Sequence, residues 1–452
     1  MRSIALSRSF FGRICISFIR AVLLVGTMLT PFEMAAQQTG TSKPLSSPPQ
    51  SPPMAMHMGR ATSLRELVQE AAEKNPQIAA TFHSWQAARN VSKEVLALPE
   101  TQVSVQQFSV GSPRPFAGYS NSEFAYVGFG VSQDIPYPGK RDLRAHVAEH
   151  EADIMEAQTD SVRRMVVGNL KIVYFRLAYF QQTLNVLQRS DELLNQVQQA
   201  AEARYRVGQG NQQDVLKAQL QHTKILQEIA HHHQEEGLLE VQIKQFLGRP
   251  QASPDIVTET LTARSLSFSA PELLQKASEQ NPDVRSKQAS IQQQESQVEL
   301  ARKNFRPDFN VQYNYQHTNG DTRDYYMATF GIRLPNRGRQ KAELAEAQQN
   351  QERARREFDS ESQRVLSEVQ QQFVRAKTSE EQLKIYSDGL LPQSEAAFRS
   401  ALSAYQSNRQ DFESLLSSFL DVLNLDLDYR HELVEHESAL AELERLTGVD
   451  VP

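Results

Sequence analysis

The residues of this sequence best suited to chemistry are clustered methionines and histidines, which suggest metal binding. Met54, Met56, His57 and Met58 lie in one short stretch, and thioether sulfur together with imidazole nitrogen suits soft ions such as Cu(I) and Ag(I). The alternative is an ordinary disordered linker, because the preceding residues are rich in Pro and Ser. We favour the linker, assign no metal site, and keep these four residues as candidate ligands.

Two further histidine clusters lie in sequence of helical character. Consecutive residues of a helix point about 100° apart, so His231, His232 and His233 cannot chelate one ion together. We expect them on a solvated helix face. His146 and His150 are four residues apart and could share a face, which would permit a two-nitrogen metal contact. The sequence offers no evident third ligand, so we expect surface histidines here too.

No combination of residues predicts catalysis. The sequence has no Gly-rich phosphate loop, no Gly-x-Ser-x-Gly turn and no His-Glu-x-x-His pair. Its only cysteine, Cys15, lies in a segment that we expect to be removed, so no thiol chemistry would remain. The formal net charge of -6, without a basic block, argues against nucleic acid as a partner. We therefore predict neither an enzyme nor a bound cofactor.

Charged and hydrogen-bonding residues gather at two turns that interrupt helical sequence. Glycine adopts the left-handed conformation without a Cβ clash, so Gly208 predicts a tight turn between antiparallel helices. Aligning Tyr205 with Tyr405 places Asn408 at the position of Gly208, and asparagine is the next most tolerant residue there. The residues that such turns would offer to a gate or a docking partner are Arg204, Arg206, Gly208, Asp214, Tyr405, Asn408 and Arg409. The alternative is a pair of solvated turns without function.

The elements that position these turns are duplicated. The pattern Leu-Val-x-x-Ala-x-x-x-Asn-Pro at 67–76 recurs as Leu-Leu-x-x-Ala-x-x-x-Asn-Pro at 273–282, an offset of 206 residues (273 − 67). Each copy predicts a short amphipathic helix, a break at Asn-Pro and a second helix. We expect a first repeat over residues 63–250 and a second over residues 251–452.

Each repeat then changes from a period of 3.6 to a period of 2. Apolar and aromatic residues alternate with polar ones over 125–131, 309–315 and 326–334, and less regularly over 103–110. Segments of about 10 residues with one apolar and one polar face are typical of membrane strands, and a soluble β-hairpin is the alternative. Because a membrane barrel needs about eight strands, four would have to be pooled among several chains, most simply around a cyclic axis.

Long helices follow the strands. A proline and a glycine at 136–139 and again at 335–338 end each strand pair with a bend. Helices are expected from roughly 142 to 205 and from 341 to 405, and some 64 residues make a rod of about 100 Å. Their antiparallel partners return to about 246 and 444. Pro392 should kink the second rod.

The N-terminus differs from the rest. Arginines precede an apolar run at 21–29, and Met34-Ala35-Ala36 follows, so we expect a signal peptide over residues 1–36. Residues 37–62 are rich in Pro and Ser and predict a disordered linker. No later run of about 18 apolar residues predicts a transmembrane helix.

From about residue 63 to 446 the sequence resembles the TolC-type outer-membrane efflux channel family. The resemblance rests on the duplicated Asn-Pro break, the Pro-Tyr-Pro-Gly-Lys-Arg junction at 136–141 and the Tyr-Arg-Val-Gly turn at 205–208 with its following Asp-Val-Leu. It implies a mainly α fold with a small membrane β part. Long antiparallel helical hairpins would form an α-barrel tunnel, and four strands per chain would join a shared trimeric β-barrel.

The resemblance also implies a function and partners. The chain would be the passive outer-membrane channel of a tripartite efflux pump that extends into the periplasm of a Gram-negative-type cell. Its partners would be two identical chains, a periplasmic adaptor, an inner-membrane resistance–nodulation–division pump and outer-membrane lipid. Residues 133–140 look most like the branch that serves heavy-metal exporters. The alternatives are a channel for type I protein secretion and a periplasmic coiled-coil scaffold.

In this family the turns are periplasmic tips that close the tunnel. An aspartate like Asp214 pairs with a tyrosine like Tyr405 and with an arginine. Here the arginine position falls on Gln410, with Arg409 one place earlier, and the acidic ring of the family falls on Ser414 and Ser417. Asp411 or Glu413 would have to replace that ring.

Overall fold

We analysed a computed structural model of the chain. It describes residues 62–120, 122, 124–319 and 323–449. The expected signal peptide, the expected linker up to residue 61 and the four candidate ligands at Met54, Met56, His57 and Met58 lie outside the described residues.

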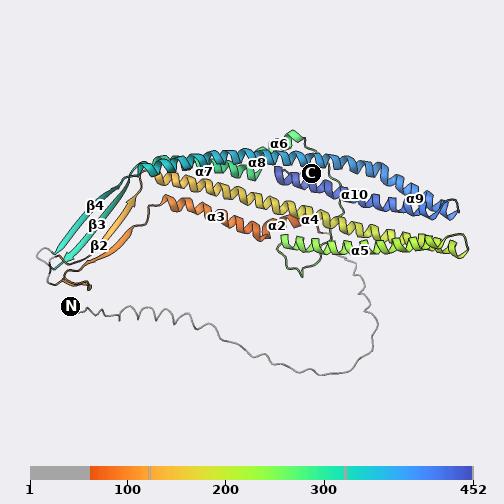
Figure 1. The fold of residues 1–452 in the computed structure, drawn as a ribbon, viewed down its shortest axis with the longest axis horizontal. Helices are drawn as coiled ribbons and strands as arrows, with labels where there is room; N and C mark the ends of the chain where they lie inside the picture. The colour runs from red at the N-terminus through yellow and green to blue at the C-terminus, as the bar shows by residue number, and fades with distance from the viewer. Residues whose placement is uncertain (1–61, 121, 123, 320–322, 450–452) are drawn as a thin grey trace, which may run out of the picture. The chain divides into compact units, whose positions relative to one another are not determined.

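The same succession of elements occurs twice along the chain (Figure 1). The first contains α2 (Leu64–Lys74), α3 (Pro76–Leu96), β1 (Gln102–Phe108), β2 (Tyr126–Ile135), α4 (Lys140–Arg206) and α5 (Gln212–Phe246). The second contains α6 (Ala270–Gln280), α7 (Pro282–Lys303), β3 (Asp308–Thr318), β4 (Asp324–Arg333), α8 (Arg337–Ile385), the π-helical turn η1 (Tyr386–Leu390), α9 (Leu391–Gln406) and α10 (Phe412–Thr447). The fold is therefore mainly helical with a small sheet, as predicted.

The Asn-Pro break has the same physical role in both halves. The side-chain oxygen of Asn75 accepts hydrogen bonds from the Gln77 and Ile78 amides and so caps α3, and its Nδ2 donates to the Phe246 carbonyl at 2.8 Å. Asn281 caps α7 in the same way and donates to the Leu446 carbonyl at 3.0 Å. Backbone N–H groups in the first turn of a helix have no partner within the helix. The proline that follows each asparagine has no N–H, so it leaves no donor unpaired there. Each asparagine thus starts one helix and ties it to the end of a long helix.

The four strands form one antiparallel sheet in the order β1-β2-β3-β4. Val105 is opposite Phe129, Phe129 is opposite Tyr315, and Tyr315 is opposite Tyr326, so the predicted alternation produces one continuous apolar face. This face is uncovered within the chain, and Val105 is 83% exposed. The irregular strand expected over 103–110 ends at Phe108. Among the described helices, none combines the length and the hydropathy that a membrane span requires.

The junction between β2 and α4 joins the two halves. Gly139 precedes α4 with a φ of 82°, and a Cβ there would lie 2.1 Å from the Lys303 ammonium group. Lys140 is only 3% exposed. Its ammonium group donates to the Asp308 carboxylate at 2.8 Å and to the Arg306 carbonyl at 2.9 Å. The glycine thus permits the bend, and the lysine anchors it to the second half.

The helices form two rows that share α4 (Figure 1). Near the sheet the order is α3, α4, α7, α8, and toward the helical turns it is α5, α4, α10, α9. Apolar clusters fill the contacts in both rows. Near Pro392, where a kink is expected, the second rod contains the π-helical turn η1, which directly precedes α9. This is the expected consequence of a proline that cannot donate to the preceding turn.

Replacing Lys140 by Met should lower the free energy of unfolding by about 2 kcal/mol, because the partly buried Asp308 carboxylate would lose its partner. Chemical denaturation of the detergent-solubilised protein, followed by circular dichroism, measures this change. Arg339→Met is the matched control, because Arg339 occupies the equivalent place in the second half and is exposed. Equal losses in the two variants would contradict a special role for Lys140.

Candidate functional site: the paired helical tips

The two predicted turns have the same backbone geometry. Gly208 has a φ of 75° and Asn408 a φ of 60°, so both adopt the left-handed conformation. The Gly208 amide donates to the Tyr205 carbonyl at 3.0 Å, and the Asn408 amide donates to the Tyr405 carbonyl at 3.1 Å. Both predicted tight turns are confirmed. We call residues 204–214 the first tip and residues 404–414 the second tip.

One apolar cluster lies beneath both tips. It contains Leu194 from α4, Ala218 from α5, Tyr405 from α9 and Leu415 from α10, among others. Tyr405 is 2% exposed, whereas its equivalent Tyr205 is 48% exposed. The two tips are therefore alike in backbone but different in what they present to solvent.

Arg204 links the first tip to the second. Its Nη1 donates to the Tyr405 carbonyl at 3.0 Å, and its Nη2 donates to the Asn408 side-chain oxygen. The guanidinium carbon also lies 4.4 Å from the centre of the Tyr405 ring. A hydrogen bond from a charged donor is stronger than one between neutral groups. The cation–π contact adds electrostatic attraction between the guanidinium and the ring. The equivalent of Arg204 in the second tip is Ala404, so only the first tip supplies this link.

Asp214 lies close enough to Tyr405 to interact with it electrostatically. In the described part of a single chain, these two side chains form no hydrogen bond with each other. The Tyr405 hydroxyl is buried and has no hydrogen-bond partner among the described residues. Burial raises the pKa of Tyr405, the positive charge of Arg204 opposes this, and the negative charge of Asp214 adds to it. The pairing that the family resemblance implies for Asp214 therefore stays a prediction for the assembled protein.

Two other predicted tip residues, Arg206 and Arg409, lie at the surface. Arg206 is 74% exposed, and its guanidinium lies 3.8 Å from the Glu202 carboxylate on the same helix. Arg409 is exposed. An ion pair between Lys217 and Glu413 connects α5 to α10.

Asp411 caps α10 by accepting from the Ser414 amide at 2.9 Å, and hydrogen bonds from Ser414 lower the pKa of Asp411. The contacts of Arg204 and Lys217 with the second tip do not follow from any sequence pattern. Only the difference between Arg204 and Ala404 in the repeat alignment signalled an asymmetry.

The expected solvated face is wrong for His232. His232 is 7% exposed and packs edge-on against Phe180, with ring centres 5.0 Å apart. Its Nδ1 lies 2.9 Å from the Glu228 carbonyl oxygen, and burial lowers its pKa. His231 and His233 are exposed as expected. Consecutive residues point to different sides of a helix, so the middle histidine alone meets α4.

His146 and His150 line a hollow of about 630 Å³ between α4 and α7. Nδ1 of His150 lies 3.2 Å from the Asp153 carboxylate. Throughout the described ranges, no group of three His, Cys, Asp or Glu side chains could hold a metal ion.

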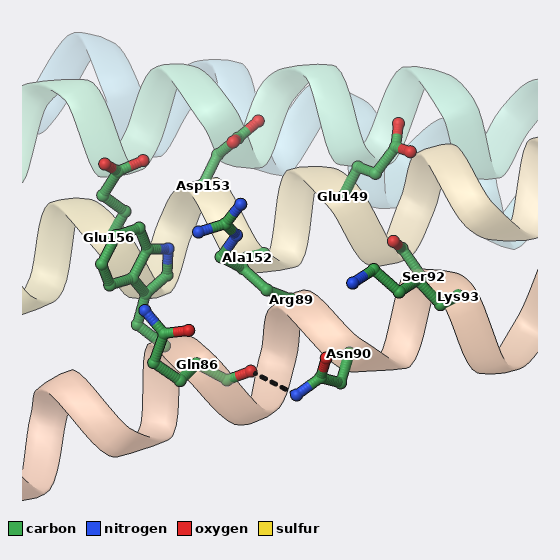
Figure 2. A pocket seen from close by; sticks show the side chains of 10 residues that line it. Gln86, Arg89, Asn90, Ser92, Lys93, Glu149, Ala152, Asp153 and Glu156 are labelled. Atoms are coloured by element: carbon green, nitrogen blue, oxygen red, sulfur yellow. Dashed lines mark hydrogen bonds between the residues drawn. The ribbon is translucent and has the colours of Figure 1, made fainter.

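A second hollow, of about 770 Å³, lies between α3 and α4 (Figure 2). Arg89 and Lys93 come from α3, whereas Glu149, Asp153 and Glu156 come from α4. The hollow is thus lined by basic side chains of one helix and acidic side chains of the other.

The model of the family described as outer membrane efflux protein matches residues 67–249 and 273–443. The chain belongs to the outer membrane efflux protein family. It is an outer-membrane efflux channel, which is a passive protein and not an enzyme. The family resemblance drawn from the duplicated motifs is confirmed.

Relatives of this efflux protein include a metal-resistance protein and several channels. The sequence is 23% identical over 321 residues to the cobalt-zinc-cadmium resistance protein CzcC of Cupriavidus metallidurans, covering 70% of this chain and 75% of CzcC. The outer membrane protein VceC of Vibrio cholerae has a similar fold, with a TM-score of 0.72, 18% identity, and 86% and 97% of the two chains covered. CusC is similar at a TM-score of 0.72 and 16% identity, with 89% and 99% covered.

Replacing Asn408 of the efflux protein by Val should destabilise the second tip by about 1–2 kcal/mol, because a β-branched residue is strained at positive φ. Asn408→Gly keeps the backbone and removes only the bond from Arg204. The rate of trypsin cleavage at the tips should therefore increase more for Val than for Gly. Ser407→Val, at a φ of -89°, is the control. Equal cleavage of the Val and Gly variants at position 408 would contradict the backbone argument.

Proposed function

We propose that this efflux protein acts as a homotrimer whose three sheets close into one barrel in the outer membrane. The observation that carries the proposal is the uncovered apolar face of a sheet whose β1 and β4 are both edge strands. An edge strand offers unpaired backbone groups, and closure between copies removes every edge. β4 of one copy would pair with β1 of the next, and the apolar face would contact lipid.

The helical rows support the same arrangement. α3 and α8 flank the row near the sheet, and α5 and α9 flank the row near the tips. β1, α3 and α5 belong to one side of the protomer, and β4, α8 and α9 belong to the other. A contact between unlike sides of neighbouring protomers is heterologous. Such contacts form a closed ring when the rotation from one protomer to the next returns to the first protomer. The helices would then enclose a tunnel that extends into the periplasm.

We further propose that the tips are the periplasmic gate and the docking site for an adaptor, through which an inner-membrane pump delivers the cargo. Arg204, Asp214, Tyr405 and Asn408 would hold the gate, and Arg206 and Arg409 would remain available to partners. Gly208 provides the turn that the first tip requires.

We propose metal ions as the cargo. Support comes from the likeness to a cobalt-zinc-cadmium resistance protein and from the junction residues 133–140.

Arg204→Ala should raise the single-channel conductance in planar bilayers, because the first tip would lose its hydrogen bonds to the second. Arg206→Ala is the matched control, because it removes an equal charge from the same tip but no contact with the second tip. Equal conductance of the two variants would place the gate elsewhere.

The cargo is tested by deleting the gene and measuring growth on cobalt, zinc, cadmium, copper, silver and nickel salts beside drugs and detergents. We expect sensitivity to metal salts that the restored gene reverses. Sensitivity to drugs and detergents alone would overturn the metal assignment while leaving the channel intact. A loss of secreted proteins instead would favour type I secretion.

A further inference from the structure

The sheet has a polar face opposite its apolar one. Successive residues of a strand point to opposite faces, so neighbouring rows across the four strands alternate in character. One apolar row consists of Val103, Val131, Tyr313 and Ala328. The polar row beside it consists of Gln102, Ser132, Gln312 and Thr329. Hydroxyl and amide groups bind water, so the polar face suits the aqueous interior of a barrel.

The charged side chains of the polar face gather at one end of the sheet. Among the described strand residues of this face, they are Asp134, Asp308 and Arg333. Asp134 is next to last in β2, Asp308 begins β3 and Arg333 ends β4, so all three lie beside the helices. Three copies of the chain would therefore place a ring of charges where the proposed barrel meets the helical tunnel.

Each carboxylate of this group has a cationic partner. Oδ1 of Asp134 lies 3.5 Å from Nη2 of Arg333 and accepts a hydrogen bond from Asn310 at 2.9 Å. The Asp308 carboxylate accepts from the Lys140 ammonium group at 2.8 Å. Lys140 is buried, whereas the side chains of Arg333 and Asp134 are 70% and 42% exposed. The pair of Asp134 with Arg333 is therefore the one in contact with solution.

The position of this exposed pair indicates an electrostatic role. An exposed ion pair contributes little to folding stability, so stability does not explain it. Charges on the wall of a narrow aqueous channel with low-dielectric surroundings concentrate ions of the opposite sign. Rings of carboxylates select cations, and rings of arginine or lysine select anions. A carboxylate paired with a guanidinium cancels both effects.

We propose that Arg333 is a selectivity-determining residue, which lets the barrel pass ions of both signs by cancelling the charge of Asp134. This inference rests on the proposed barrel, in which the polar face surrounds the lumen. Without Arg333, three uncompensated Asp134 carboxylates would face the lumen and would favour cations over anions. A ring of free carboxylates would also bind metal cations and slow their passage.

The test measures the electrostatic potential at a single engineered thiol. Cys15, the one cysteine of the sequence, lies in the expected signal peptide, so a reporter would be the only thiol of the mature chain. Thr329→Cys places the reporter on the polar face of β4, and Ala328→Cys is its matched control on the apolar face.

The mature protein, purified in a neutral detergent, is treated with a cationic and with an anionic methanethiosulfonate. Both reaction rates are measured at about 10 mM ionic strength, where the Debye length is about 30 Å and the field of Arg333 reaches the reporter.

We expect both reagents to modify Thr329→Cys, and the detergent to protect Ala328→Cys. In the Thr329→Cys background, Arg333→Ala should raise the ratio of cationic to anionic reaction rates about threefold or more, because a charge is lost from each of three chains. Arg333→Lys keeps the charge and should leave the ratio unchanged, whereas Asp134→Asn should lower it. Arg399→Ala removes an exposed arginine on α9 and should not change the ratio.

Two outcomes separate the role of Arg333 from the proposed barrel. An unchanged rate ratio in Arg333→Ala, with the Thr329→Cys thiol reactive and the Ala328→Cys thiol protected, would overturn the role of Arg333 and leave the barrel intact. Equal reactivity of the two thiols, or no reaction at Thr329→Cys, would overturn both, because the polar face would then not surround a water-filled lumen.

Discussion

The pairing of β2 with β3 is the interaction on which the rest of this structure depends. Each half of the chain contributes only two strands, and a two-stranded hairpin is marginal by itself. The pairing runs from Tyr126 opposite Thr318 to Ile135 opposite Phe309, so it spans the whole of β2. It aligns the ends of the strands and therefore the starts of the long helices. The ion pair between Lys140 and Asp308 fixes this alignment immediately beside the sheet.

Duplication explains both the regularity of the molecule and its asymmetry. Asn75 and Asn281 perform the same capping and tethering in the two halves, because the geometry of a short helix meeting a long one is the same in both. The tips share a backbone for the same reason. The two tips differ at the position where the first contacts the second. A hydrogen bond between two turns needs a donor side chain on only one of the turns. Arg204 is that donor, and Ala404 is its equivalent.

Burial separates residues that are neighbours in sequence. His232 contacts α4, whereas His231 and His233 are exposed. Tyr405 lies in the shared apolar cluster, whereas Tyr205 is half exposed. In each case the residue type is the same and the packing differs. The surface that a partner would meet at the first tip is thus more aromatic than that at the second.

The secondary-structure elements and their order follow from the amino-acid sequence alone. Local rules suffice for these features: a period of 2 or 3.6 in apolar residues, asparagine before proline at a helix start, and glycine or asparagine at a left-handed turn. The alternation over 309–315 and the turn at Gly208 are examples, and both agree with the structure. The π-helical turn likewise lies next to Pro392, where the proline predicts an irregularity in the second rod.

Which side chains contact one another, by contrast, depends on the three-dimensional packing. Arg204 reaches Tyr405 and Asn408 across some 200 residues of sequence, and Lys140 reaches Asp308 across 168. No spacing rule connects such distant positions, because their contact depends on strand register and helix packing together.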